Sequence, residues 1–403
     1  MVIPGVDVGW SIRTESGNAV EHGAPVTSGC GPDLLDDAWR IIVDGAHQGA
    51  YAGAVAAIAR RGALVLHRAT GWAVCDPVCV PMDPETIFDL ASLTKVVATL
   101  PSVLRLIDGR VVGLDDPVGS VLPEFGTTGW KGDVTIRRLL SHSAGLAAWL
   151  PLYLDHEGSE AYLAAIANAE PAARPGETMI YSDLGFILLG EVVRRAGGAD
   201  IARFAATEVF APLGLRDTTF TPPPSLRERI AATERGNETE IGMCGERATT
   251  FPRWRRGMIW GEVNDGNSFY GLAGVAGHAG LFGTATDLIH YGQLWLQGGV
   301  RNGHRILGED LVAEATREQA PGRGLGWRLP APAPGGDRAD PGRALGPRSY
   351  GHTGFTGTSL WVDPVRELVV VLLTNRLHPT ARSEIDTIRP AFHAAVAAAC
   401  GEE

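Results

Sequence analysis

The stretch Phe88–Leu100, FDLASLTKVVATL, places a serine and a lysine three residues apart, at Ser92 and Lys95. If a helix begins near Ser92, one helical turn brings the hydroxyl and the amine onto the same face. Apolar residues continue with helical spacing after the lysine, and Pro101 predicts a kink or break in that helix. A partly desolvated lysine can be neutral enough to take a proton from a hydroxyl. The pair therefore predicts a serine nucleophile activated by a lysine.

Lysine is rare in this chain, which makes its presence beside a serine informative. Only two of the 35 basic residues are lysine, Lys95 and Lys131, and the rest are arginine. An S-x-x-K pattern arises by chance in many proteins. Arginine cannot lose its proton in a protein, however, and lysine can. The use of lysine at this position therefore favours a chemical role over chance.

The composition fits a folded globular protein and argues against several classes of partner. The 403 residues are 45 % hydrophobic and 20 % charged, so the chain can bury a large core. The formal net charge is −11 and the basic group at Arg253–Arg256 is short, so we expect no nucleic-acid partner. No apolar run reaches membrane-spanning length, and the N-terminus lacks signal-peptide features. We therefore expect a cytoplasmic protein with no membrane partner.

The cysteines and histidines give no sign of a metal or cofactor. The spacing of the five cysteines matches no disulfide or zinc framework. Cys75 and Cys79 could bind a metal, but without a paired cluster we expect free thiols. No H-E-x-x-H spacing appears, and His278 in AGHAG is interpreted as a structural histidine. The cysteines are Cys30, Cys75, Cys79, Cys244 and Cys400.

Apolar periodicity and turn residues predict hairpins near both ends of the chain and helices between them. The segment Leu368–Thr374 has the strongest strand pattern, and the Pro-, Gly- and Arg-rich residues 320–349 are predicted to be a surface excursion. Besides the helix after Ser92, we expect helices near residues 32–43, 134–146, 161–169, 184–196, 201–209, 286–297 and 385–399, and hairpins over 54–70 and 351–376.

This order of elements predicts an α+β fold, in which an antiparallel sheet flanked by helices is joined to an all-helical subdomain. Strands from both ends of the chain can share the sheet. We expect an irregular lead over residues 1–31 and one catalytic domain over 32–403. Within that domain, an α/β part (about 32–100 and 275–403) encloses a helical and loop insertion (about 101–274). The cleft between the two parts is the expected site.

A second motif, Tyr181-Ser182-Asp183, precedes an apolar helical segment. A tyrosine near a lysine can have its pKa lowered and can shuttle protons. Asp183 is also a favoured residue for capping the helix that follows. A loop tyrosine before a capping residue is common, so this motif alone is weak.

A third motif, His352-Thr353-Gly354, begins the last hairpin. Its small and polar residues would keep the strand edge open for a substrate. The backbone N–H of Phe355, together with that of Ser92, could form an oxyanion hole. The alternative is an ordinary strand with a glycine and an exposed histidine.

Together, and in this order, SLTK (92–95), YSD (181–183) and HTG (352–354) resemble the serine β-lactamase and penicillin-binding-protein superfamily. The closest likeness is to the class C-like branch, which carries a tyrosine motif. That branch includes β-lactamases, D,D-carboxypeptidases, esterases, D-aminopeptidases and biosynthetic acyltransferases. The resemblance covers roughly residues 35–400 and implies a β-lactamase/transpeptidase-like fold. Similar flanks are LLSHSAGL (139–146), GVAGHAGLFGTATDL (274–288) and GHTGFTGTSLWVDP (351–364).

The resemblance implies a catalytic role for Ser92, Lys95 and Tyr181. Ser92 would be the nucleophile that forms an acyl-enzyme. Lys95 would lower the pKa of Ser92 or take its proton. Tyr181 would relay that proton to the leaving group and then activate water or an acceptor.

The resemblance also implies a substrate-binding edge. His352 stands where the usual lysine lies and would, with Thr353 and Gly354, help to orient the substrate. Ser92 and Phe355 would supply the backbone donors of the oxyanion hole. Histidine in place of lysine weakens the fixed positive charge that a substrate carboxylate would meet.

Asp183 departs from the asparagine that usually ends the tyrosine motif. That asparagine amide contacts the acyl side-chain amide of a β-lactam or peptide. An ionised aspartate can only accept hydrogen bonds. Asp183 therefore argues against ordinary penicillin or peptide recognition and favours a substrate that carries a donor.

These observations favour a serine hydrolase or transacylase that acts on an ester or amide. Its partners would be a small-molecule acyl donor and either water or an amine or alcohol acceptor, as in a biosynthetic acyltransferase. The alternatives are a D,D-carboxypeptidase or class C-like β-lactamase, or a non-catalytic binding protein that had lost a reactive residue. Aromatic residues that could line the cleft are Trp149, Tyr153, Trp254, Trp260, Tyr270 and Phe355.

Overall fold

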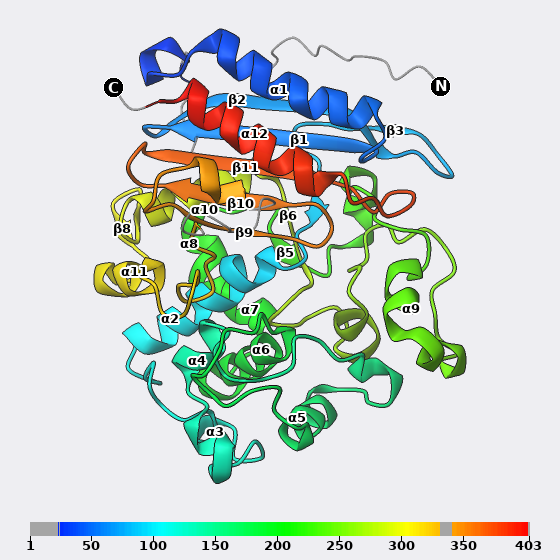
Figure 1. The fold of residues 1–403 in the computed structure, drawn as a ribbon, viewed down its shortest axis with the longest axis vertical. Helices are drawn as coiled ribbons and strands as arrows, with labels where there is room; N and C mark the ends of the chain where they lie inside the picture. The colour runs from blue at the N-terminus through cyan, green and yellow to red at the C-terminus, as the bar shows by residue number, and fades with distance from the viewer. Residues whose placement is uncertain (1–22, 24, 331–340, 402–403) are drawn as a thin grey trace.

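A six-stranded antiparallel sheet forms the centre of the computed structural model, which describes residue 23, residues 25–330 and residues 341–401. Its strand order is β3-β2-β1-β11-β10-β9 (Figure 1). Strand β1 (Gly53–Arg60) pairs with β11 (Leu368–Thr374), with Ala57 opposite Val371. The two ends of the chain therefore meet in the middle of one sheet, and the predicted α+β fold is confirmed.

The remaining strands extend this sheet or form two small ones. The strands β4, β6 and β5 make a three-stranded sheet beside the helical part, and β7 pairs with β8. Their bounds are β2 Ala63–Val74, β3 Val80–Pro81, β4 Phe88–Asp89, β5 Thr219–Phe220, β6 Leu281–Gly283, β7 Val300–Arg301, β8 His304–Arg305, β9 Tyr350–Thr353 and β10 Ser359–Asp363.

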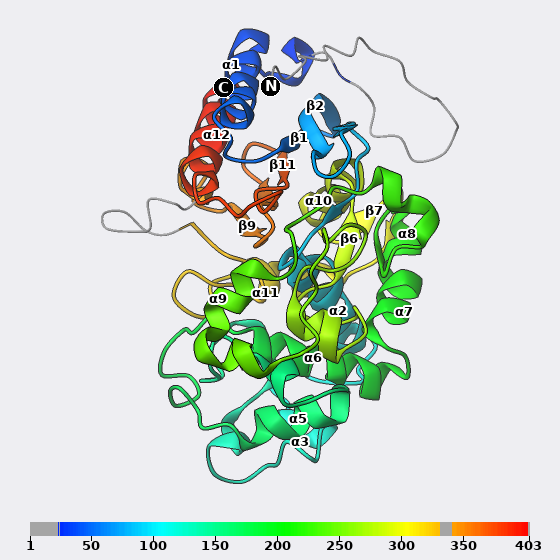
Figure 2. The ribbon, with the colours of Figure 1, turned by 90° about the vertical axis from the view of Figure 1, so that its right-hand side faces the viewer.

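Helices cover both faces of the main sheet. The helices α1 (Pro32–His47) and α12 (Ile385–Ala399) lie together on one face, and α10 (Ala285–Leu296) lies on the other (Figures 1 and 2). Alternate residues of β11 enter two separate cores: Val371 packs on the α10 side, whereas Leu372 packs on the α1 and α12 side. Burial on both faces explains why this strand is apolar throughout instead of alternating.

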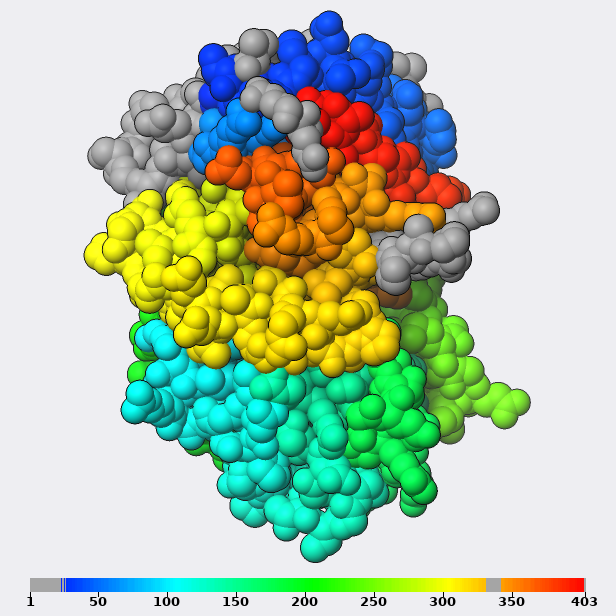
Figure 3. Space-filling model, turned by 60° about the vertical axis from the view of Figure 1, so that its left-hand side comes forward, coloured from blue at the N-terminus to red at the C-terminus, as the bar shows by residue number. Residues whose placement is uncertain are grey.

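The middle of the chain forms a helical part below the sheet in Figure 1. A π-helical turn, Lys95–Thr99, leads into α2 (Leu100–Asp108), which packs on α6 (Asp183–Gly197). Figure 3 shows residues near 300 to 330 between the sheet and this helical part. The other helices are α3 Val118–Val121, α4 Ile136–Leu140, α5 Ser159–Asn168, α7 Ile201–Ala205, α8 Ala211–Leu213, α9 Glu238–Cys244 and α11 Glu309–Thr316. Across the described ranges, no helix is long and apolar enough to span a membrane.

Some local predictions differ from the structure. The helix expected over 134–146 is only α4, because the chain turns at His142, whose φ of +58° is not helical. At Pro101 the helical segment does not end but changes type: the π-helical turn Lys95–Thr99 stops just before it, and Pro101 lies in the first turn of α2. Within residues 320–349, Trp327 is fully buried, so that part is not a surface excursion, and 331–340 lie outside the described residues. Most of the expected lead 1–31 also lies outside them.

A disulfide joins Cys30 and Cys400, although the cysteine spacing predicted no disulfide framework. Cys75 and Cys79 are free thiols, as expected. Cys30 lies just before α1 and Cys400 just after α12, so the bond links the ends of the two helices that cover one face of the sheet. The partners are 370 residues apart in sequence, and no spacing rule connects cysteines at that separation. The other three cysteines are free.

Thiol titration tests this pairing. Denatured, unreduced protein should react at the three free cysteines, and prior reduction should expose all five. Cys400→Ser should lower the free energy of unfolding by about 2–4 kcal/mol, because it removes a cross-link between distant residues. Cys79→Ser, at an exposed free thiol, is the matched control and should leave that free energy nearly unchanged. Five reactive thiols before reduction would contradict the disulfide.

Candidate active site

Ser92 lies on a tight turn between β4 and the π-helical turn Lys95–Thr99. The preceding residue, Ala91, has a φ of +46°, a region that non-glycine residues rarely occupy and that is often found at functional sites. The carboxylate of Asp89 accepts the Ala91 N–H at 2.9 Å and holds this strained backbone. The turn therefore presents the Ser92 side chain to the cavity described below.

Lys95 is fully buried and directs its amine at three oxygen atoms. Its Nζ lies 2.9 Å from Ser92 Oγ, 3.1 Å from the carbonyl of His278 and 2.7 Å from Asp183 Oδ1. The ammonium group donates hydrogen bonds to the first two of these oxygens and forms an ion pair with the third. Lys95 thus links the predicted nucleophile to the tyrosine motif.

The sequence suggested that burial would make Lys95 neutral, but the surroundings of Lys95 keep it charged. Burial does lower the pKa of Lys95, but Asp183 and then Tyr181 raise it more, so the pKa lies above its ordinary value. The Lys95 side chain is therefore a cation at neutral pH. In the resting site it can stabilise negative charge near Ser92, and it is not poised to accept a proton.

Asp183 therefore has a different structural role from the helix cap that the sequence suggested. The N-cap of α6 is Ser182, whose Oγ accepts the N–H of Gly185 at 3.3 Å. Asp183 is the first residue of the helix, and its carboxylate faces Lys95 and the cavity. A carboxylate in the first turn of a helix is also favoured by the helix dipole.

Tyr181 lies among cations and imidazole rings. The Nζ of Lys95 is 4.9 Å from the centre of its ring, and the guanidinium of Arg323 is 5.1 Å from it. The rings of His142 and His352 lie 4.6 and 5.8 Å from the tyrosine ring. The Tyr181 ring therefore lies next to the amine that contacts Ser92 Oγ.

His352 is buried and uncharged. Its Nδ1 contacts the carbonyl of Thr353 at 2.8 Å. Burial lowers the pKa of His352 far below its ordinary value, and the nearby cations Arg323 and Lys95 lower it further. His352 therefore does not supply the positive charge of the lysine that the resemblance predicts at this position. Arginines supply positive charge in this part of the site instead.

Gly354 allows the third motif to approach the nucleophile turn. A Cβ added there would lie 2.1 Å from Thr358 Oγ1 and 2.6 Å from the carbonyl of Leu90, so no larger residue fits. The hydroxyl of Thr358 donates to the same carbonyl at 3.1 Å. In the described part of the chain, the N–H groups of Ser92 and Phe355 donate no hydrogen bond, so both are available to an oxyanion.

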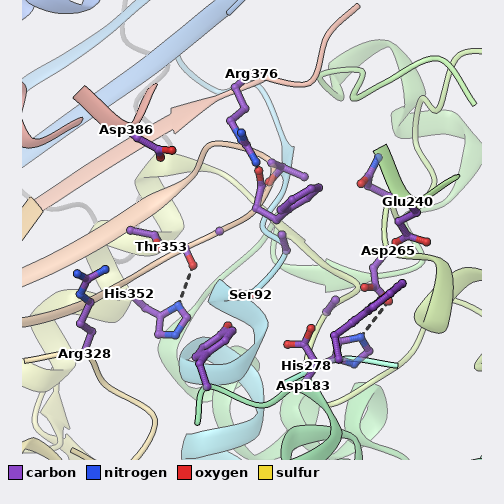
Figure 4. Close-up of a pocket in the computed structure, with 18 of the residues that line it drawn as sticks. Ser92, Asp183, Glu240, Asp265, His278, Arg328, His352, Thr353, Arg376 and Asp386 are labelled. Atoms are coloured by element: carbon purple, nitrogen blue, oxygen red, sulfur yellow. Dashed lines mark hydrogen bonds and ion pairs between the residues drawn. The ribbon is translucent and has the colours of Figure 1, made fainter. Parts of the chain in front are cut away.

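The three motifs line one cavity of about 390 Å³. Arginines dominate one side of it and carboxylates the other (Figure 4). The labelled charged residues on the first side are Arg328, Arg376 and Asp386, and Arg389 lies 3.9 Å from Asp386. Arg323 also lines the cavity and lies over the Tyr181 ring. Those on the second side are Asp183, Glu240 and Asp265. The predicted residues Ser92, Tyr181, Asp183, His352, Thr353, Gly354 and Phe355 all line the cavity, and Lys95 lies behind Ser92.

On the arginine side, Arg389 is a buried cation with few partners. Its side chain is 6 % exposed, and its contact with Asp386 is long, at 3.9 Å. Its Nε has no hydrogen-bond partner among the residues that the structure describes. Burial lowers the pKa of Arg389 to about 10, and neighbouring arginines contribute to that shift. Such a guanidinium would gain a partner from an anionic group in the cavity.

On the opposite side, two carboxylates lie close to one another. Burial, with the charge of Asp265, raises the pKa of Glu240 to about 8. Glu240 accepts hydrogen bonds from the Gly266 N–H at 2.7 Å and from the Tyr153 hydroxyl at 2.8 Å. His278 lies 2.9 Å from Asp265, so it has a structural partner as predicted, but it also lines the cavity.

Sequence reasoning missed the arginines, Glu240 and Asp265, because none belongs to a recognisable motif. Of the aromatic residues expected near the cleft, Trp149 and Phe355 line the cavity. The rings of Tyr153, Trp254 and Tyr270 pack on one another instead, and Trp260 packs in a separate apolar cluster. Among the described residues no group of side chains could hold a metal ion.

Sequence comparison places the chain in a family. Residues 39–395 match the family model described as Beta-lactamase. The chain belongs to the β-lactamase family. This confirms the resemblance drawn from the three motifs, and the chain is a serine hydrolase of the β-lactamase fold.

Relatives within the β-lactamase family carry different names. An Escherichia coli protein named "Putative D-alanyl-D-alanine carboxypeptidase" is 33 % identical over 314 residues, which cover 73 % of this chain and 70 % of that protein. EstCE1, described as a hydrolase with promiscuous acyltransferase activity, is 25 % identical with a TM-score of 0.69 and covers 91 % of this chain and 99 % of its own. A penicillin-binding-protein homologue from Caulobacter crescentus is 24 % identical with a TM-score of 0.69, over 92 % and 99 % of the two chains. At that identity the last likeness shows the fold alone.

The charge of Lys95 can be measured directly, because the chain has only two lysines. In protein made with isotope-labelled lysine, the Lys95 signal should remain that of an ammonium up to about pH 10. Asp183→Asn should lower the pKa of Lys95 below 10.5, since burial then opposes the charge without the carboxylate. The raised pKa also means that the ion pair stabilises the fold below about pH 10 and stops doing so as pH rises further.

The measurement is an NMR titration of the labelled lysines. The variant Lys131→Arg has only Lys95 left and therefore assigns the two signals. The Lys131 signal should titrate normally in wild type and in Asp183→Asn. A wild-type Lys95 that titrates near neutral pH would show that the ion pair does not hold the proton on the amine.

Proposed function

We propose that the protein transfers an acyl group from an ester or amide to water, or to an amine or alcohol, through an acyl-enzyme on Ser92. The observation that carries this proposal is the hydrogen bond between Ser92 Oγ and the buried amine of Lys95 at the wall of a cavity. The available N–H groups of Ser92 and Phe355 lie in turns that border the same cavity, as an oxyanion hole requires.

In this mechanism Ser92 Oγ forms a bond to the substrate carbonyl carbon, and the negative charge moves to the carbonyl oxygen at the two N–H donors. Lys95 is already protonated, so Tyr181 relays the proton: its hydroxyl gives its own proton to the leaving group as that bond breaks and takes the Ser92 proton in return. The acceptor, water or an alcohol or amine, then attacks the acyl carbon and its proton passes to Tyr181. The bond between Ser92 Oγ and the acyl carbon breaks, and Ser92 takes back a proton from Tyr181. Lys95 stabilises the charge that develops on either oxygen.

The arginine side of the cavity supports a substrate that carries an anionic group. Arg389 lacks a close partner, and an added carboxylate would give it charge-assisted hydrogen bonds. The same feature, together with the names of the relatives, supports D,D-carboxypeptidase activity as a second candidate. Asp183 weighs against it, because its carboxylate cannot donate to the carbonyl of an acyl amide.

Intact-protein mass spectrometry after brief exposure to a p-nitrophenyl ester, a penicillin and a D-alanyl-D-alanine peptide tests the proposal. We expect a mass increase from the ester that Ser92→Ala abolishes without loss of fold. Lys95→Ala and Tyr181→Phe should each slow ester turnover by about 10²–10⁴-fold. Turnover in Ser92→Ala equal to wild type would overturn the mechanism. A stable penicillin adduct or peptide cleavage would instead favour the carboxypeptidase candidate.

A pair of esters that differ by one charge tests the arginine side. For phenyl acetate and 3-carboxyphenyl acetate, Arg389→Gln should raise KM about tenfold or more for the carboxylated ester only, since a hydrogen bond to a charged group contributes about 1.5–3 kcal/mol. Arg382→Gln, at an exposed position, is the control and should change neither. An equal effect of Arg389→Gln on both esters would exclude recognition of the carboxylate.

A further inference from the structure

His142 is a buried residue with a strained backbone, close to the site but in none of the three motifs. It follows α4 and is 2 % exposed. Its φ of +58° lies in the left-handed region, which is unfavourable for a residue with a Cβ. Such strain persists only where surrounding contacts hold it. The contacts of His142 therefore show what this conformation achieves.

The contacts of His142 fall on both sides of Tyr181. Its carbonyl accepts the N–H of Ile180 at 2.9 Å, and its ring Nδ1 accepts the N–H of Ser182 at 3.0 Å. Its ring also lies against the tyrosine ring, with centres 4.6 Å apart and planes 38° from one another. One residue thus holds the peptide groups on either side of the tyrosine and the aromatic ring itself.

The hydrogen bond from the Ser182 N–H determines which nitrogen of the His142 imidazole carries the proton. Because Nδ1 accepts a backbone N–H, it carries no proton, and the proton of the neutral ring is on Nε2. Burial, with the charges of Arg323 and Lys95, lowers the pKa of His142 far below its ordinary value and keeps the ring neutral. An apolar ring at this position would leave the Ser182 N–H buried without an acceptor.

The loop that follows His142 extends this support. The carbonyl of Ala147 accepts the Ser182 hydroxyl at 2.7 Å, and that of Ala148 accepts the Asp183 N–H at 2.8 Å. Residues 142–148 therefore form the surface on which the tyrosine motif lies. From this loop, the ring of His142 lies against the Tyr181 ring.

We propose that His142 is a positioning residue that sets the Tyr181 ring against Lys95 and Ser92. The proposal deepens the proposed function and rests on it for the consequence to turnover. The placement of the ring itself can be tested without any reaction. His142 touches no reacting atom in this scheme, and its effect passes through Tyr181 alone.

Two matched variants separate positioning from simple packing. The Oδ1 of asparagine can occupy the place of the imidazole Nδ1, and asparagine tolerates a left-handed backbone. The amide of glutamine lies one bond farther out and cannot accept from Ser182 N–H in the same geometry. His142→Asn should therefore preserve the position of Tyr181, whereas His142→Gln should not.

The Lys95 side-chain signal in isotope-labelled protein reports the position of Tyr181, whose ring lies 4.9 Å from the Lys95 Nζ. We expect His142→Gln to move the Lys95 signal away from its wild-type position. We expect His142→Asn to leave the signal close to that position. The Lys131 signal should not move in either variant. An unchanged Lys95 signal in a folded His142→Gln protein would overturn the proposal whether or not the protein has the proposed activity.

Turnover of the ester gives the second measurement. We expect kcat to fall by about 10²-fold in His142→Gln, with KM within about twofold, and most of kcat to return in His142→Asn. In a Tyr181→Phe background, His142→Gln should have little further effect, because both changes act on one step. Equal losses in the Asn and Gln variants, or a full additional loss in the Tyr181→Phe background, would contradict positioning through Tyr181.

Discussion

The ion pair between Lys95 and Asp183 is the interaction on which the arrangement of the site depends. Lys95 follows the nucleophile along the same helical segment, whereas Asp183 begins α6 in the helical part, so the pair joins two distant segments beside the cavity. A charge with no exposed surface is costly unless it is paired and hydrogen-bonded. Loss of either partner would leave the other charge near a low-dielectric core. The pair therefore fixes where the serine and tyrosine motifs lie relative to one another.

Because Lys95 is paired with Asp183, other residues determine the charge of the rest of the cavity. His352 is neutral, so the strand that carries it offers shape and backbone donors, and Gly354 lets that strand reach the nucleophile turn. The positive charge that lines the cavity comes from the arginines instead, among them Arg389 of α12. The cavity thus has a cationic side and an acidic side, with the serine between them (Figure 4).

The parts of the fold that could be predicted are those with strong local patterns. The strand Leu368–Thr374 and the helix Ile385–Ala399 have the bounds that their apolar runs predict. The motif residues were found because serine, lysine and tyrosine chemistry needs particular side chains at particular spacings. Residue type does not determine partners, however. Ser182 and Asp183 are both good capping residues, and which one caps the helix depends on where Lys95 lies. Arg389 looks like any surface arginine of an amphipathic helix.

The pairing of β1 with β11 has a consequence for how the protein is made. The centre of the sheet joins residues near 55 to residues near 370, and the turn that carries Ser92 is held by hydroxyl groups of Thr356 and Thr358. Contacts so distant in sequence close late and slow folding. A growing chain that already contains Ser92 still lacks the strands that hold the Ser92 turn in place. During synthesis the reactive centre therefore cannot assemble until β11 has left the ribosome, and a fragment that ends before β11 would contain Ser92 without the strands that hold its turn.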